Sequence, residues 1–188
     1  NGGVTHLNDV IVVMPVFSEG KKIAWTANIA HWPDLGGMAP GGISADATEI
    51  FQEGLQLPVI KIINEGKSIQ SVIDIITANS RVPQYTLGDM WAAIASIRVG
   101  EKRIKDIAKK YGKNIFEDSV KLFMDYGEKS SLGALSKLPN GTYHGEDLLD
   151  DGRKIQVDVT INENEFIVDL RNNPEQDAGP NNASYDGT

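Results

Sequence analysis

The sequence predicts a mixed α+β fold: an N-terminal β-hairpin, a central helical segment with two long helices, and a C-terminal β-hairpin. Three patterns carry this prediction. Strand-like runs around a turn signal open the chain, apolar residues at helical spacing fill its middle, and apolar–polar alternation returns near its end. We therefore expect a hairpin, loop and short helix over residues 1–67, a helical segment over 68–138, and a hairpin and tail over 139–188.

The N-terminal hairpin is predicted by two runs rich in β-branched and aromatic side chains. These runs cover residues 10–17 and 22–30, and Ser18–Lys21 between them is a turn signal. With the turn centred on Glu19 and Gly20, the residues just before the first strand lie beside those just after the second.

Two His-x-x-Asp units flank these strands. His6 and Asp9 form the first, His31 and Asp34 the second, and together they use two of the three histidines in the chain. The predicted register places Asp9 opposite Ala30, which brings both units to the open end of the hairpin. Each histidine alone would be an ordinary surface or core residue. Two imidazoles with one or two carboxylates are instead a donor set typical of first-row divalent metals, so we predict a metal site here.

His6, Asp9 and His31 are the predicted metal ligands, and the ion is expected to be Zn, Mn or Fe. Because the chain has no cysteine, only nitrogen and oxygen donors are available. A site of this kind keeps open positions, where the ion polarises a carbonyl oxygen or lowers the pKa of bound water. Asp34 is the candidate catalytic residue as a general base, with a fourth ligand or a partner of His31 as alternatives. His144 stands alone and is expected at the surface.

Leu35–Ile43 holds four glycines and a proline, so it is expected to be a loop. It is a connecting loop or, alternatively, a phosphate cradle built from backbone N–H groups. Since it directly follows His31 and Asp34, we expect it to border the site.

The remaining elements follow from periodicity and from start and stop signals. The expected elements are a short helix over 47–53, a strand over 59–63, a helix over 68–79, a long helix over 86–111 ending at Gly112, a helix from 114 towards 138, and strands over 155–161 and 166–170.

Composition limits the function classes. The net charge of −8 and the pI near 4.9 argue against nucleic acid or an anionic membrane as partner. The longest apolar run is far shorter than a membrane span, and no signal peptide is visible. With no cysteine, the composition is compatible with a cytoplasmic protein.

Several blocks resemble the hydantoinase B/oxoprolinase family. They are GGVTHLNDVIVVMPVF, the run NIAHWPDLGGMAPGGISADATEIFQEGLQLPVIKI, TLGDMWAAIASIRVG, and the stretches Leu138–Ile161 and Val168–Asn182. The second block is the most specific, because it joins the His-x-x-Asp unit, the glycine loop and an Ala-Thr-Glu-Ile segment in order. Family members are several times longer, so the resemblance implies an internal piece of such a polypeptide.

The resemblance implies a catalytic subunit that works with a hydantoinase A-type ATP-binding subunit, where ATP and Mg²⁺ are expected. Together they would open cyclic amides such as 5-oxoproline or hydantoins. A branch of the family carboxylates acetone or acetophenone, and its metal-binding residues match His6, Asp9 and His31. The expected function is therefore ATP-dependent cyclic amide hydrolysis. The alternatives are a ketone carboxylase subunit and a metal-binding piece without turnover.

Overall fold

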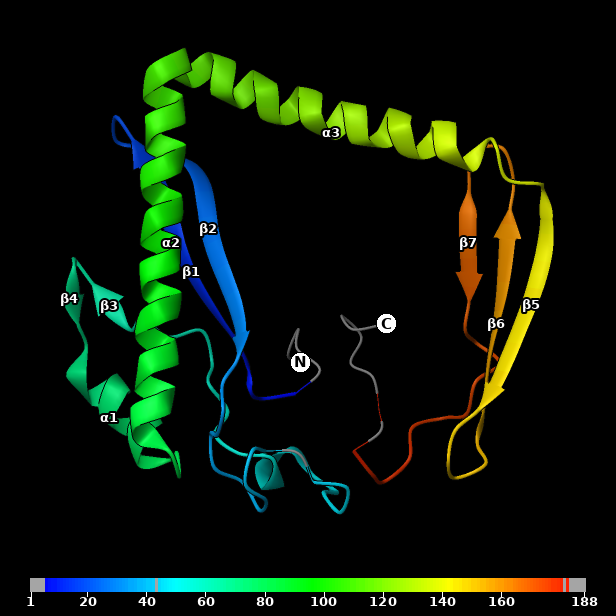
Figure 1. The fold of residues 1–188 in the computed structure, drawn as a ribbon, viewed down its shortest axis with the longest axis horizontal. Helices are drawn as coiled ribbons and strands as arrows, with labels where there is room; N and C mark the ends of the chain where they lie inside the picture. The colour runs from blue at the N-terminus through cyan, green and yellow to red at the C-terminus, as the bar shows by residue number, and fades with distance from the viewer. Residues whose placement is uncertain (1–5, 43, 181, 183–188) are drawn as a thin grey trace. The chain divides into compact units, whose positions relative to one another are not determined.

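The computed structural model describes residues 6–42, 44–180 and 182 (Figure 1). Over these residues the fold is α+β, with strands near both ends and helices between them, as the sequence predicts. The chain divides into two compact units, and each is described by itself. Unit 1 holds the described residues up to 110 with 177–180 and 182, and unit 2 holds residues 111–176. Part of the expected C-terminal tail lies outside the described residues.

Unit 1 begins with the predicted hairpin, in which β1 (Asp9–Ser18) pairs antiparallel with β2 (Lys21–His31). Its two-residue turn has positive φ at Glu19 (50°) and at Gly20 (76°), the combination that a type I′ turn requires. Alternation along the strands separates a buried face, which holds Val16, from an exposed one.

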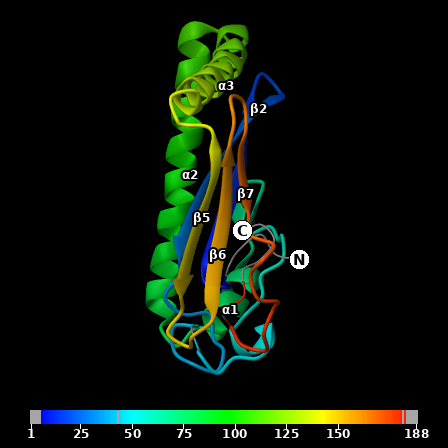
Figure 2. The same ribbon diagram turned by 90° about the vertical axis from the view of Figure 1, so that its right-hand side faces the viewer.

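The core of unit 1 lies where the end of the hairpin meets two helices, α1 (Gln70–Ala78) and α2 (Pro83–Tyr111). Helix α2 runs along the hairpin in both views (Figures 1 and 2). Gly100 permits this approach, because an added Cβ would lie 2.8 Å from Cγ2 of Thr26 on β2. The buried apolar side chains of this core are Trp32, Leu35, Ile73, Ile76, Met90 and Ile94.

Helix α2 is longer than predicted at its N-terminal end. It begins at Pro83 rather than at Thr86, because the fixed φ of proline suits the first turn of a helix. It ends at Tyr111 as predicted, and Gly112 takes a φ of 90° directly after it. Most of its buried residues lie in its first half, between Thr86 and Ile97, and Ala108 is buried near its C-terminal end.

The predictions for the segment before α1 are wrong in extent. In place of a helix over 47–53 there is a single 3₁₀ turn, η1 (Ile50–Gln52). In place of a strand over 59–63 there is a two-residue ladder of β3 (Ile63–Asn64) with β4 (Lys67–Ser68). Most of this segment has no regular secondary structure, and its apolar side chains pack against the core. The residues that pack in this way are Leu55, Leu57, Ile62 and Ile63.

Unit 2 contains α3 (Lys113–Leu135) and a three-stranded antiparallel sheet of β5 (Gly141–Leu148), β6 (Lys154–Ile161) and β7 (Phe166–Asp169). The predicted C-terminal hairpin is β6–β7. Strand β5 adds a third strand to this hairpin, and the sequence does not predict it. Its side chains are all exposed and largely polar, and such a strand shows no apolar alternation. No described residue of α3 is buried. Within the part of the chain that the structure describes, no helix is long and apolar enough to span a bilayer.

Candidate functional site

The two His-x-x-Asp units meet at the open end of the hairpin, in a register one residue away from the predicted one. Asp9 pairs with His31 rather than with Ala30. The cause is a β-bulge, since the pairing shifts between Val16 and Phe17 and an extra residue of β2 enters there. Directly opposed residues point to the same face of a sheet, so the bulge places Asp9 and His31 on one face.

His6 lies close to His31. Their ring centroids are 4.6 Å apart and the ring planes are tilted by 42°. Nδ1 of His6 is buried and has no hydrogen-bond partner within the described ranges. A buried polar atom without a partner costs free energy, and neutral imidazole nitrogens are common metal ligands. The two adjacent imidazoles therefore fit the nitrogen donors of the predicted site.

The structure does not assemble the complete ligand set. Among residues 6–42, 44–180 and 182, no group of three or more His, Asp or Glu side chains is arranged to hold a metal ion. Asp9 is the backbone partner of His31, and His6 contacts His31 through its ring. The convergence of all three donors on one ion stays a prediction.

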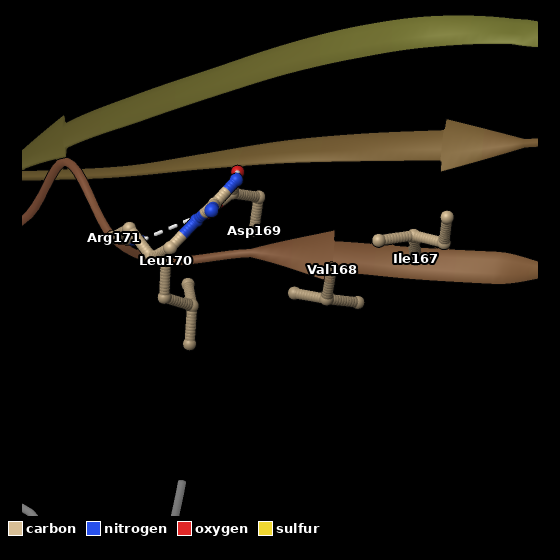
Figure 3. A pocket seen from close by; sticks show the side chains of 5 residues that line it. All are labelled: Ile167, Val168, Asp169, Leu170 and Arg171. Carbon is tan, nitrogen blue, oxygen red and sulfur yellow. Dashed lines mark hydrogen bonds and ion pairs between the residues drawn. The ribbon is translucent and has the colours of Figure 1, made fainter.

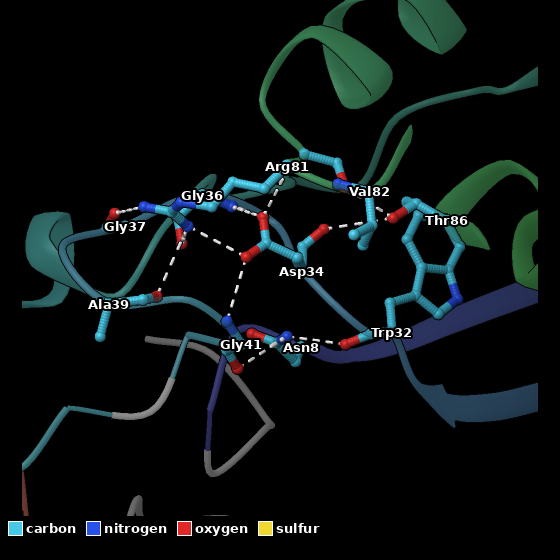
Figure 4. Close-up of polar contacts among 11 residues, drawn as sticks. Asn8, Trp32, Asp34, Gly36, Gly37, Ala39, Gly41, Arg81, Val82 and Thr86 are labelled. Atoms are coloured by element: carbon cyan, nitrogen blue, oxygen red, sulfur yellow. Dashed lines mark hydrogen bonds and ion pairs between the residues drawn. The ribbon is translucent and has the colours of Figure 1, made fainter. Parts of the chain in front are cut away.

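Asp34 is buried and bonded through both carboxylate oxygens (Figure 4). Oδ1 accepts from the backbone N–H groups of Gly36 and Arg81, each at 3.0 Å. Oδ2 accepts from the N–H of Gly41 and from Nη1 of Arg81, again at 3.0 Å. Burial alone would raise the pKa of Asp34, but these hydrogen bonds outweigh it and lower the pKa from 3.8 to about 2. This geometry favours an anchoring role, while a catalytic role for Asp34 stays a prediction.

Sequence reasoning missed two residues that organise this region. Arg81, between α1 and α2, donates from Nη1 to the carbonyls of Gly36 (3.2 Å) and Ala39 (3.5 Å), and from Nη2 to that of Gly37. Asn8 is fully buried within the first His-x-x-Asp unit. No motif marks Arg81, whereas the position of Asn8 between two predicted ligands is a signal that could have found it.

The glycine loop, residues 35–42 in the described structure, is tied to the histidine end of the hairpin by Asn8. Nδ2 of Asn8 donates to the carbonyls of Trp32 (2.7 Å) and Gly41 (3.3 Å). The loop therefore lies at the histidine end of the hairpin, where the site is predicted. The N–H groups of Gly36 and Gly41 are used by Asp34, which favours a tightly held connecting loop over a phosphate cradle.

Gly37 is expected to be the least replaceable glycine of this loop. It has a φ of +85°, and an added Cβ would lie 2.5 Å from the backbone oxygen of Glu53. Gly66 has a similar φ of +79° but no atom within 4 Å of an added Cβ, so it is a matched control. Gly37→Ala should lower the free energy of unfolding by about 1–3 kcal/mol more than Gly66→Ala does, measured by urea denaturation. Equal losses in the two variants would show that the loop backbone accommodates the added Cβ without a further loss in the free energy of unfolding.

His144 is exposed on β5, as the sequence predicts. Its Nδ1 lies 2.8 Å from Oδ1 of Asp158 on β6, and its Nε2 lies 3.4 Å from Oε2 of Glu146. The hydrogen bond to Asp158, and after it that to Glu146, raises the pKa of His144. His144 belongs to unit 2, whereas the predicted ligands belong to unit 1.

A hollow in unit 2 contains none of the predicted site residues. It is lined by the consecutive residues 167–171 at β7 and just beyond it (Figure 3). Nε of Arg171 donates to Oδ1 of Asp169 at 2.8 Å, and the hydrogen bonds of Arg171 lower the pKa of Asp169. A single run of chain with an internally paired Arg and Asp offers few free polar groups to a ligand, so we place the candidate site in unit 1.

The α+β fold of this chain occurs within larger enzymes of known structure. The crystal structure of ATP-dependent caprolactamase from Pseudomonas jessenii matches with a TM-score of 0.87 and 29% identity, over 93% of this chain and 31% of that one. The nucleotide-free structure of an acetone carboxylase shares the fold, with a TM-score of 0.75 and 18% identity over 88% of this chain and 24% of that one.

The chain belongs to the hydantoinase B/oxoprolinase family, whose model matches residues 1–188. It is 34% identical to the putative B-type subunit of a D-/L-hydantoinase from a Pseudomonas species, over 89% of this chain and 30% of that protein. It is also 34% identical to an uncharacterized protein of Methanocaldococcus jannaschii, over 96% of this chain and 32% of that protein. The chain thus spans about a third of the length of these relatives.

Proposed function

We propose that the chain is part of the metal-containing catalytic subunit of an ATP-dependent cyclic amide hydrolase that opens hydantoin or 5-oxoproline rings. One observation carries the proposal: within a chain of this family, the hairpin brings the rings of His6 and His31 to 4.6 Å, with a buried unpartnered nitrogen on His6. The similarity to a hydantoinase component and to a caprolactamase supports the substrate class.

The proposed ligands are His6, Asp9 and His31. A divalent ion bound there would supply Lewis acidity, holding a carbonyl oxygen or acidifying a bound water. The lactam is a poor electrophile, and phosphorylation of its carbonyl oxygen by ATP provides a better leaving group. ADP is released, water adds to the former carbonyl carbon, and the C–N bond breaks as the nitrogen takes up a proton, which leaves an acyl phosphate. A second water then hydrolyses the acyl phosphate, and phosphate leaves with the ring-opened acid.

The proposed partner is a hydantoinase A-type subunit that binds ATP and Mg²⁺, so that the active enzyme is a hetero-oligomer. Relatives such as the beta chain of a caprolactamase and the delta chain of an acetophenone carboxylase are components of multi-subunit enzymes, which supports this arrangement. We place the enzyme in the cytoplasm, consistent with a chain that contains no cysteine.

The second candidate is a component of an acetone- or acetophenone-type carboxylase. It is favoured by 30% identity to the delta chain of an acetophenone carboxylase over 76% of this chain. In that reaction a phosphorylated enol would attack carbon dioxide released from carboxyphosphate. The third candidate is a metal-binding piece without turnover of its own.

The test is substrate-driven ADP formation by the full-length subunit assembled with its ATP-binding partner. We expect ADP to form with hydantoin, 5-oxoproline or caprolactam, together with equimolar ring-opened acid. ADP formation only with a ketone and bicarbonate would establish the carboxylase instead. Metal bound without ADP formation on any of these substrates would leave the non-catalytic candidate.

A further inference from the structure

Arg81 binds the glycine loop through several acceptors at once (Figure 4). Its Nη1 donates to the Asp34 carboxylate and to two loop carbonyls, its Nη2 donates to the carbonyl of Gly37, and its own backbone N–H donates to Asp34. A planar guanidinium is suited to this task, because its donors have fixed directions and hold several oxygens in one geometry. Arg81 and Asp34 together hold the loop through these hydrogen bonds, and we call this pair of residues the clasp.

The clasp is connected to the predicted ligands by short steps. Gly41 donates to Asp34, and the carbonyl of Gly41 accepts from Asn8. Asn8 stands between His6 and Asp9 in sequence, and its backbone carbonyl accepts from the N–H of Trp32 at 2.8 Å, next to His31. A displacement of the loop would therefore act on the backbone that carries these side chains.

We propose that Arg81 is a positioning residue that fixes the glycine loop as a rigid wall beside the histidine pair. It acts through the loop and not on the substrate, because both terminal nitrogens of its guanidinium are already bound to loop oxygens and to Asp34. The functional part of this inference rests on the cyclic amide hydrolase proposed above, whereas the structural part does not.

The experiment compares Arg81→Ala and Arg81→Lys with Arg98→Ala in the full-length subunit assembled with its partner. Arg98 is an exposed arginine of α2, so its removal controls for the loss of one positive charge. Hydrogen exchange is measured on peptides covering residues 35–42, together with kcat, KM and metal content. Arg81→Ala removes hydrogen-bond donors from the buried carboxylate of Asp34. If that variant does not fold, Arg81→Lys is measured in its place, because it keeps a positive charge beside Asp34.

We expect exchange in the loop to accelerate at least about tenfold in Arg81→Ala relative to Arg98→Ala, with peptides from the turn end of the hairpin, residues 13–26, unchanged. We expect kcat to fall about 10–100-fold with metal content retained, and Arg81→Lys to restore part of both properties. Loop exchange equal to that of Arg98→Ala would overturn the clasp. Faster exchange with kcat and KM at wild-type values would overturn the positioning role.

A failure of the proposed function is recognised separately. If the wild-type enzyme forms no ADP with cyclic amides, the hydrolase assignment is wrong, and the exchange measurement still decides whether Arg81 holds the loop.

Discussion

His31→Ala should remove most of the bound metal and, with it, substrate-dependent ATP hydrolysis. The variant loses one of two imidazoles whose rings lie 4.6 Å apart, so of this pair only the imidazole of His6 remains to bind the ion. Because changes to residues that merely support a metal ligand cost 10–100-fold in affinity or activity, loss of a ligand should cost more than about 100-fold. The measurement is metal content by elemental analysis and ADP formation, both on the assembled full-length enzyme.

Folding should be nearly untouched by the same change, because the side chain of His31 is exposed. His144→Ala is the matched control, since it also removes an imidazole, and that imidazole lies in unit 2 beside the carboxylates of Asp158 and Glu146 from its own sheet. We expect wild-type metal and wild-type turnover from the control. Loss of metal in His144→Ala with full retention in His31→Ala would place the site elsewhere.

Asp34→Ala should produce the largest loss of stability among single changes near the site. The carboxylate is buried and accepts four hydrogen bonds, two of them from Arg81. Its removal leaves the amides of Gly36 and Gly41 without their acceptor and the guanidinium without its counter-ion. We expect the free energy of unfolding at neutral pH to fall by about 2–4 kcal/mol, a figure reduced from that of a fully buried pair because the side chain of Arg81 is 42% exposed.

The pH dependence of stability identifies the same carboxylate. The pKa of Asp34 is lowered from 3.8 to about 2 in the folded protein, so folding favours its ionised form. This contribution of about 2 kcal/mol is complete above about pH 5 and is lost as the pH falls towards 2. Denaturation midpoints of the wild type should drop across this range, and the drop should be smaller in Asp34→Ala.

Asp106→Ala serves as the control for this experiment, because Asp106 is exposed on α2. Its effect on the free energy of unfolding should stay within about 0.5 kcal/mol, and its acid profile should follow the wild type. If the acid denaturation profile of Asp34→Ala matched that of Asp106→Ala, Asp34 would not be the group whose protonation destabilises the fold.

The parts of the fold that the sequence predicts are those with strong local signals. The N-terminal hairpin, α1, the C-terminal end of α2, and the β6–β7 hairpin all follow from periodicity, turns or caps. The register at the site does not, because the bulge between Val16 and Phe17 depends on how the strands twist and pack, and the adjacent Pro15 does not by itself set which residues pair. Strand β5 is missed for a different reason, since an exposed polar strand has no buried face to impose a period.

The residues of the candidate site also fall into those that a local sequence pattern reveals and those that it does not. His6, Asp9, His31 and Asp34 are visible as a repeated spacing because one hairpin carries both units. Arg81 is 47 residues from Asp34 along the chain, and only the packing of α1 and α2 against the loop brings the two together. A long-range pair of this kind leaves no local pattern, so the clasp is seen only in the folded chain.

The most direct test of the central claim is anomalous X-ray diffraction from crystals of the metal-loaded enzyme, recorded on both sides of the absorption edge of its metal. We predict a peak about 2.0–2.3 Å from a ring nitrogen of His6 and of His31 and from a carboxylate oxygen of Asp9. A fully occupied peak that touches none of these three side chains, for example one between His144, Glu146 and Asp158, would contradict the account.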